Sequence, residues 1–270
     1  MDFKIKKPQP FSLKETLDCG QCFRFNETAP NIFEGVVKYR YIKIKEEKEY
    51  LTFFDTEEKE YYEFFADYFD LNRDYEKINT NLSKDLTLKK IVESEKGIRI
   101  MNQDPFEALI SFIISQNNNI PRIKGIIERL CENFGEKIKN GYLFPTPYAL
   151  MDKTTDDLAP LRAGFRARYI LDAAKRIANN EIDLKALILM PTDKAREELM
   201  KICGVGKKVA DCTLLFSLRH INAFPKDVWI NRAMDDLFKN GLPKSAEEYA
   251  GIAQQYIFNY YRKNKLHNRA

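Results

Sequence analysis

The stretch that decides the fold is L-M-K-I-C-G-V-G-K-K-V-A-D-C-T-L-L-F-S-L-R-H-I-N-A-F-P-K-D, residues 199–227. At its centre, Gly204-Val205-Gly206 predicts a tight turn, because glycine adopts positive φ at no steric cost. Apolar residues recur at helical spacing on both sides of the turn, after a candidate N-cap at Thr192 and again from Val209 to Phe216. We therefore expect a helix-hairpin-helix over about residues 192–219.

A glycine turn that leads into a helix favours the binding of an anion. Exposed backbone N–H groups and the positive end of the helix dipole both attract phosphate. Because such contacts read no base edge, Gly204, Val205, Gly206 and Lys207 are candidates for holding a DNA backbone. The alternative is an ordinary turn between two helices, in which glycine is present only for steric reasons.

Two lysines open the second helix, and their neighbours differ. Lys207 has Asp211 four residues later, so a solvated ion pair is available to it. Lys208 has Cys212 and Leu215 on its own stripe, although Asp211 is also three residues away. We expect Lys208 to be the more dehydrated amine and therefore the better nucleophile.

Asp227 follows Lys208 by 19 residues and precedes another helical pattern, which Gly241 ends. The aspartate therefore predicts a helix N-cap. As a cap alone it requires no catalytic role. Its association with Lys208 is what suggests a second role.

These motifs closely resemble the helix-hairpin-helix/Gly-Pro-Asp superfamily of DNA glycosylases. G-V-G-K-K is similar to the hairpin and catalytic lysine of the lyase-active members, and F-P-K-D is similar to the segment that ends in the superfamily's aspartate. V-A-D-C after the lysine resembles the 8-oxoguanine DNA glycosylases of the eukaryotic type. The resemblance implies that Lys208 and Asp227 are catalytic.

Two distant segments extend the resemblance to the base pocket. C-G-Q-C-F-R, residues 19–24, is similar to the family's G-Q-x-F-R, whose glycine carbonyl accepts a hydrogen bond from N7–H of 8-oxoguanine. Guanine lacks that hydrogen, and a buried acceptor facing a lone pair costs about 1–3 kcal/mol. A-G-I-A-Q-Q-Y-I-F, residues 250–258, is similar to the segment whose glutamine and phenylalanine bond and stack on the flipped base. The resemblance implies that the base is held by Gly20, Gln254, Phe258, Phe216 and Cys212.

Two further motifs suggest contacts with the opposite strand. Residues 115–119, S-Q-N-N-N, read as turn and capping residues, and Asn119 is expected to be a cap. The family pattern implies in addition that Asn117 fills the gap left by the extruded base and that Arg122 reads the orphaned cytosine. In R-A-G-F-R it places an aromatic wedge at Phe165 and a second base contact at Arg166. A charged helix start is the alternative there.

The remaining chain divides into a strand-rich and a helical part. Strands are expected at Phe23–Phe25, Ile32–Tyr39, Tyr41–Lys45 and Tyr50–Phe54. The aromatic segment 56–70 has helical spacing and is expected to cover the sheet, with stacking on single-stranded bases as the alternative. Capping boxes are expected at Asp104–Glu107 and Ser245–Glu248. The predicted fold class is α+β, with an N-terminal twisted antiparallel β-sheet domain and its covering helices (1–98) before a larger all-helical domain with the catalytic cleft (99–270).

Composition limits the class of protein. The chain has 270 residues with 44% hydrophobic and 31% charged residues, and a net charge of +4 that permits an acidic partner without requiring one. Five cysteines at irregular spacing indicate a reduced protein. Cys19 and Cys22 lack a second pair for zinc, and the C-terminal part has no four-cysteine cluster for iron and sulfur. We expect no metal, no organic cofactor, no membrane segment and no secretory signal.

The resemblance spans residues 19–258. It implies a bifunctional 8-oxoguanine DNA glycosylase and AP lyase that acts on double-stranded DNA containing 8-oxoguanine. We expect a monomer, and we expect it in a prokaryotic cytoplasm because the short N-terminus carries no nuclear or mitochondrial signal. Trp229, Phe216 and Ile252 stand where family members carry histidine, methionine and tryptophan, which leaves a phosphate contact, the pocket shape and the opposite-base preference open. The rival interpretations are a relative with another lesion or no opposite-base preference, and a non-catalytic helix-hairpin-helix module that binds DNA without cleaving it.

Overall fold

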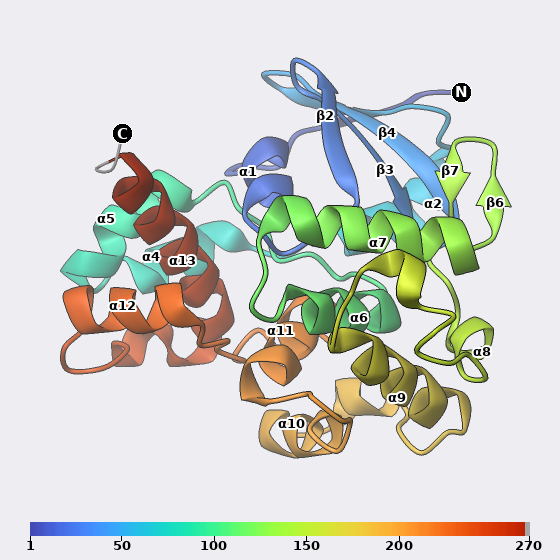
Figure 1. The fold of residues 1–270 in the computed structure, drawn as a ribbon. Coiled ribbons are helices and arrows are strands. Elements are labelled where there is room, and N and C mark those ends of the chain that lie inside the picture. Colours follow the sequence, from blue (N-terminus) through green and yellow to red (C-terminus); the bar gives the residue numbers. More distant parts are fainter. Residues whose placement is uncertain (268–270) are drawn as a thin grey trace.

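In the computed structural model, which describes residues 1–267, an antiparallel sheet lies at one end and helices form the rest of the molecule (Figure 1). The strand order is β1-β5-β4-β3-β2, and every neighbouring pair is antiparallel. This arrangement confirms the predicted α+β fold class. The strands are β1 (Phe3–Lys6), β2 (Phe25–Ala29), β3 (Ile32–Val37), β4 (Arg40–Glu46) and β5 (Tyr50–Phe53).

Two features of the sheet differ from the sequence prediction. The strand expected at Phe23–Phe25 begins only at Phe25, because Phe23 turns into the helical core and packs edge-on against Phe112 at 5.9 Å. Strand β1 was not expected. It is an edge strand that carries lysine at positions 4 and 6, and its backbone pairing with β5 holds it in place.

The aromatic segment after β5 covers one face of the sheet. It forms α2 (Glu58–Glu60), the π-helical turn η1 (Tyr61–Phe65) and α3 (Ala66–Tyr68). Phe53 of β5 meets the rings of Tyr61, Phe65 and Phe69 at centroid distances between 5.2 and 6.1 Å. Most of the aromatic side chains of this segment are therefore buried in the core, as expected. Of the tyrosines in residues 56–70, only Tyr62 is largely exposed.

Helix α6 (Pro105–Ser115) is the centre of the helical part. Residues 106–114 are all buried, because α7, α9 and α11 surround the helix. No helix within residues 1–267 is both long and apolar enough to cross a membrane. The other long helices are α4 (Tyr75–Leu82), α5 (Leu86–Glu95), α7 (Ile120–Phe134), α9 (Arg166–Ala178), α10 (Thr192–Leu199), α11 (Lys207–Ser217), α12 (Val228–Leu237) and α13 (Ala250–His267).

Short elements connect these helices. Helix α7 lies along the lower edge of the sheet in Figure 1, and its Lys124 donates to the carbonyl of Phe25 at the start of β2. The short elements are α1 (Leu13–Asp18), α8 (Pro147–Leu150), the hairpin β6 (Lys137–Ile138) and β7 (Gly141–Tyr142), and the 3-10 turns η2 (Ala159–Leu161), η3 (Ala186–Leu189) and η4 (Lys244–Tyr249).

The described residues form two hydrophobic cores, and the division between them does not follow the sequence order strictly. The sheet, α1 and the aromatic segment share one core. Helices α4 and α5 belong to the other, because α5 packs on the C-terminal helix α13. The boundary expected at residue 98 therefore separates helices that pack together, and it stays a proposal.

Two predicted capping boxes are wrong in part. Asp104 caps α6 as expected, by accepting from the N–H groups of Phe106 and Glu107. The Glu107 carboxylate, however, faces Arg24 at 3.5 Å, because this buried acid needs a cation. At Ser245 a 3-10 turn, started by Pro243, replaces the expected helix start, and the serine hydroxyl makes no hydrogen bond in the described structure.

Candidate active site

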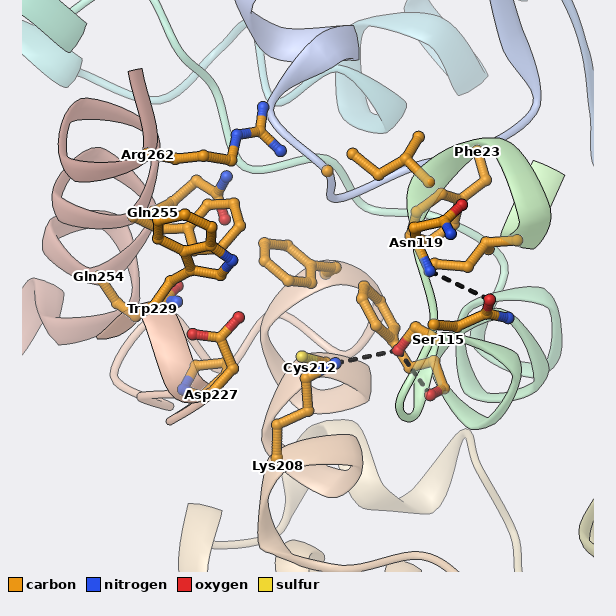
Figure 2. A pocket seen from close by; sticks show the side chains of 18 residues that line it. Phe23, Ser115, Asn119, Lys208, Cys212, Asp227, Trp229, Gln254, Gln255 and Arg262 are labelled. Carbon is orange, nitrogen blue, oxygen red and sulfur yellow. Dashed lines mark hydrogen bonds between the residues drawn. The ribbon is translucent and has the colours of Figure 1, made fainter. Parts of the chain in front are cut away.

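A cavity of about 310 Å³ opens where α6, α11, α12 and α13 meet the loop after α1 (Figure 2). Seven of the residues expected at the site line it together: Gly20, Lys208, Cys212, Phe216, Asp227, Gln254 and Phe258. Its remaining lining residues are Phe23, Phe112, Ser115, Asn118, Asn119, Ile120, Ile123, Pro225, Trp229, Gln255 and Arg262.

Lys208 lies in the first turn of α11 and points into the cavity. Its Nζ donates to the hydroxyl of Ser115 at 3.0 Å and lies 5.2 Å from the centre of the Phe112 ring. The side chain is half-buried, and it makes no ion pair with any carboxylate of the described residues. The amine is therefore held by a neutral hydroxyl and an aromatic face.

Asp227 is the N-cap of α12, as predicted from the sequence. Its Oδ1 accepts from the backbone N–H of Ile230 at 2.8 Å. The carboxylate lines the same cavity as Lys208 and faces it across the pocket in Figure 2. The cap hydrogen bond and the helix dipole both stabilise a negative charge at this position.

Cys212 lies between these two charged groups, one helical turn after Lys208. Burial raises the pKa of the Cys212 thiol to about 11, the Lys208 charge opposes that shift, and the Asp227 charge adds to it. Both charged side chains are thus close enough to act on one buried thiol. A neutral thiol next to Lys208 leaves the lysine as the nucleophile of the cavity.

Gly20 contributes backbone to the opposite wall. Its φ is +85°, and a Cβ at this position would lie 3.7 Å from both Arg262 and Phe258. Among the groups that the structure describes, none donates a hydrogen bond to the Gly20 carbonyl. A free backbone acceptor therefore lies beside the cavity.

Two residues of α13 and one of α11 provide the surfaces for a planar ligand. Gln254 is only 4% exposed, yet its Oε1 has no hydrogen-bond partner in the described structure. Phe258 lies one turn later, half-buried at the pocket wall. Phe216 stacks on Phe112 at a centroid distance of 5.4 Å and an interplanar angle of 25°. An unpaired buried amide oxygen in the same cavity as these aromatic rings fits a flat ligand with N–H donors.

The helix-hairpin-helix is present, with α10 and α11 on either side of the turn. Only Gly204 has a positive φ, of +77°, and a side chain there would strike the ring of Tyr169. Gly206 adopts an extended conformation and has open space around it. Val205 is buried and donates its N–H to Ile202. The hairpin prediction is therefore confirmed, but of the two glycines only Gly204 has positive φ.

Two side-chain predictions near the hairpin are wrong. Asp211 is paired with Arg196 at 2.5 Å rather than with Lys207, because α10 packs on this face of α11. Lys207 remains exposed. Thr192 is not the N-cap of α10: that position belongs to Pro191, and the threonine hydroxyl bonds the side chain of His220 instead.

The four residues expected at the opposite strand lie outside the cavity lining. Asn117 is exposed with a left-handed φ of +48°, and Phe165 is 50% exposed. Arg122 is exposed at the start of α7. Arg166, expected as a second contact to the orphaned base, is buried and donates to the backbone carbonyls of Gln116, Asn117 and Ala163. Burial, and then the charge of Arg122, lower its pKa.

Several residues at the cavity were not expected from the sequence. Ser115 lies in the quoted S-Q-N-N-N motif, but its contact with Lys208 depends on how α6 meets α11. The sequence gives only weak signals for two others. Gln255 is adjacent to Gln254, and Arg262 follows Phe258 by four residues, one helical turn. Among the side chains that the structure describes, no three of His, Cys, Asp or Glu are grouped closely enough to hold a metal ion.

The departures from the family pattern can now be placed. Trp229 lines the cavity beside Asp227, and Phe216 forms part of its aromatic wall. Ile252 is fully buried in the helical core and does not line the cavity. The first two replacements therefore affect the pocket shape directly.

Comparison with known proteins decides the family. Residues 110–256, more than half of the chain, match the HhH-GPD superfamily of base excision DNA repair proteins. The chain belongs to this superfamily. Residues 4–109 match the N-terminal domain of 8-oxoguanine DNA glycosylase.

Individual relatives match this chain over most of its length. It is 34% identical to the probable N-glycosylase/DNA lyase of Methanothermobacter thermautotrophicus, over 74% of this chain and 75% of the relative. The structure of MBOgg1 in complex with a low-affinity DNA ligand is similar with a TM-score of 0.92 and 40% identity, covering 98% of this chain and 96% of that one. The structure of the 8-oxoguanine glycosylase/lyase of Clostridium acetobutylicum in complex with DNA is similar with a TM-score of 0.90 and 37% identity. The match covers 98% of both chains.

Proposed function

We propose that this HhH-GPD protein is a bifunctional DNA glycosylase and AP lyase that removes 8-oxoguanine from double-stranded DNA. One observation carries the proposal: Lys208 and Asp227 line the same cavity as the free carbonyl of Gly20 and the unpaired amide oxygen of Gln254. The relative from Clostridium acetobutylicum, an 8-oxoguanine glycosylase/lyase, was crystallised with DNA that has cytosine opposite 8-oxoguanine. A nucleophile, a carboxylate and a base pocket are thus present together.

The base pocket suits a flipped oxidised purine. The ring stacks on Phe258, with Phe216 and Cys212 on the opposite wall, and Gln254 accepts hydrogen bonds from the base. The Gly20 carbonyl accepts from N7–H, a hydrogen that guanine lacks. Extrusion of the base costs a few kcal/mol, which these contacts offset in part.

The chemistry follows from the two charged groups. The Asp227 carboxylate, at the start of α12, stabilises the positive charge that develops on the sugar. The Lys208 nitrogen attacks C1′ through its lone pair as the bond to N9 breaks and the base departs with the electron pair. The departing base takes one proton from the attacking nitrogen. The C1′–O4′ bond then breaks as O4′ takes the second proton, which opens the sugar ring and gives a Schiff base. Removal of a C2′ proton finally expels the 3′ phosphate by β-elimination.

DNA contacts outside the cavity complete the proposal. Gly204, Gly206 and Lys207 hold the DNA backbone. The space around Gly206 is open and Lys207 is exposed, while Gly204 packs against Tyr169 and Val205 is buried within the turn. Asn117 and Phe165 project from exposed turns and fill the gap left by the extruded base. Arg122 reads the orphaned cytosine, with Arg166 close behind it.

We propose that one chain is sufficient, because every group named above comes from the same chain. The protein then acts as a monomer in the cytoplasm of a prokaryote, and the reaction through Lys208 uses no metal or organic cofactor.

Incubation with a duplex that contains 8-oxoguanine opposite cytosine tests the proposal. Borohydride is expected to trap a covalent protein–DNA adduct with the unaltered protein and with Lys207→Gln, but not with Lys208→Gln. Trapping by Lys208→Gln and not by Lys207→Gln would overturn the assignment of the nucleophile. Binding without cleavage would favour a DNA-binding module, and cleavage of other lesions in preference would favour another specificity.

A further inference from the structure

The loop that precedes the Gly20 wall is tied to helix α13 by two side chains. Gln255 Nε2 donates to the carbonyl of Cys19 at 2.8 Å, and Arg262 Nη2 donates to the carbonyl of Asp18 at 3.1 Å. Gln255 is 2% exposed and Cys19 is 1% exposed, so water does not compete for this hydrogen bond. The N-terminal loop is thus fixed by a helix more than two hundred residues later in the chain.

The other side of Gly20 is held as well. Gln21 donates to the carbonyl of Arg99 and accepts from the N–H of Met101, and its own carbonyl accepts from Gln103. In the loop from Asp18 to Gln21, the Gly20 carbonyl is therefore the one that receives no hydrogen bond within residues 1–267.

A glycine needs such support more than any other residue. Without a Cβ, its peptide planes rotate readily, and the φ of +85° at Gly20 is one of several accessible values. Gln255 fixes the peptide that joins Cys19 to Gly20, while Gln21 and Gln103 fix the chain beyond it. The direction of the Gly20 carbonyl is then set before a ligand arrives.

We propose that Gln255 is a positioning residue for base specificity: it orients the Gly20 carbonyl and thereby sets the preference for 8-oxoguanine over guanine. This inference rests on the proposed function. Gln255 acts through Gly20, whereas its neighbour Gln254 contacts the base itself. Arg262 supports the same loop from the cavity rim, where its guanidinium also lies 5.2 Å from the Phe258 ring.

The first test compares two reactions of the same protein. Gln255→Met keeps the length of the side chain but removes the donor, and Gln255→Glu replaces the donor by an acceptor. Each variant is expected to excise 8-oxoguanine about tenfold more slowly in a single turnover. Borohydride trapping on a preformed abasic site, where no base is recognised, should stay within about twofold of the unaltered protein.

The control variant is Asn264→Asp, which makes the same amide-to-acid change on an exposed face of α13. It should leave both reactions unchanged. An equal loss of excision and abasic trapping in the Gln255 variants would indicate a general structural role and would overturn the inference, as would no loss in either.

The second test measures specificity by binding. In a Lys208→Gln background, which leaves DNA uncut, the ratio of affinities for 8-oxoguanine and guanine opposite cytosine is determined. Gln255→Met and Gln255→Glu should each lower this ratio about tenfold, while Asn264→Asp keeps it. An unaltered protein that excises 8-oxoguanine, with an unchanged ratio in both Gln255 variants, overturns this inference alone. An unaltered protein without excision overturns the proposed function, and the inference with it.

Discussion

The hydroxyl of Ser115 joins the end of α6 to the amine of Lys208. Its oxygen accepts from Lys208 Nζ at 3.0 Å, and its hydrogen is directed to the carbonyl of Phe112 at 2.8 Å. Because the hydroxyl hydrogen is used by the backbone, a lone pair faces the amine. Ser115 therefore directs Lys208 toward the cavity without placing a second carboxylate beside it.

Ser115→Ala removes the hydroxyl that accepts this hydrogen bond and leaves Lys208 unchanged. Excision and abasic-site trapping should both slow by about fivefold, which corresponds to the loss of one hydrogen bond. Single-turnover rates measure the effect. Ser217→Ala is the matched control, since Ser217 also bonds a helix carbonyl but touches no lysine. A Ser115→Ala protein with unaltered trapping would show that the hydroxyl has no part in aligning the amine.

The buried pair of Glu107 and Arg24 makes stability depend on pH. Burial raises the pKa of Glu107 from 4.5 to about 7, and the Arg24 charge opposes the shift only in part. The folded protein thus binds this proton more tightly than the unfolded chain does. The stabilisation is complete below about pH 4.5 and is lost as the pH rises through about 7.

Glu107→Gln should remove this dependence. Between about pH 5 and about pH 8, the free energy of unfolding of the unaltered protein should fall more steeply than that of the variant. Urea unfolding at both pH values measures the difference. Glu93→Gln, an exposed change on α5, should follow the unaltered protein. Parallel pH profiles for the protein with and without Glu107 would contradict the assignment.

Arg166 holds the turn that presents Asn117. Its guanidinium donates to three backbone carbonyls, and lysine cannot reproduce that planar arrangement. Arg166→Lys should leave some of these carbonyls, the buried Ala163 carbonyl among them, without a donor. The change should destabilise the fold by about 1–3 kcal/mol and loosen the Asn117 turn. The ratio of excision opposite cytosine to excision opposite adenine should fall about fivefold. Arg168→Lys, an exposed change on the same helix, should alter neither quantity.

Local signals in the sequence were sufficient for much of this fold. Asp104, Asn119 and Asp227 each cap a helix as predicted, because a cap depends on residues within the same turn. The hairpin was predictable for the same reason. Thr192 and Ser245 failed as caps, since a distant histidine takes the threonine hydroxyl and a proline starts a 3-10 turn before the serine.

Side-chain partners across elements could not be read from spacing. Asp211 was expected to pair with Lys207 on its own helix, but Arg196 reaches it from α10. Gln255 lay next to a predicted base contact, yet its partner Cys19 is 236 residues away. Such contacts depend on how elements pack, and no periodicity in the sequence records that packing.

Asp227 has a structural role and a proposed catalytic role, and two substitutions separate them. Asn is as good an N-cap as Asp, so Asp227→Asn keeps the bond to Ile230 and should lose at most about 1 kcal/mol of stability, through the helix dipole. Asp227→Ala loses the cap as well and should cost a further ~1 kcal/mol. Both variants lack the charge that stabilises the sugar cation. Both should therefore excise 8-oxoguanine at least about a hundredfold more slowly, the usual effect of removing one electrostatic group. Excision rates that follow the unfolding free energies, with Asp227→Asn close to the unaltered protein, would reduce Asp227 to a helix cap.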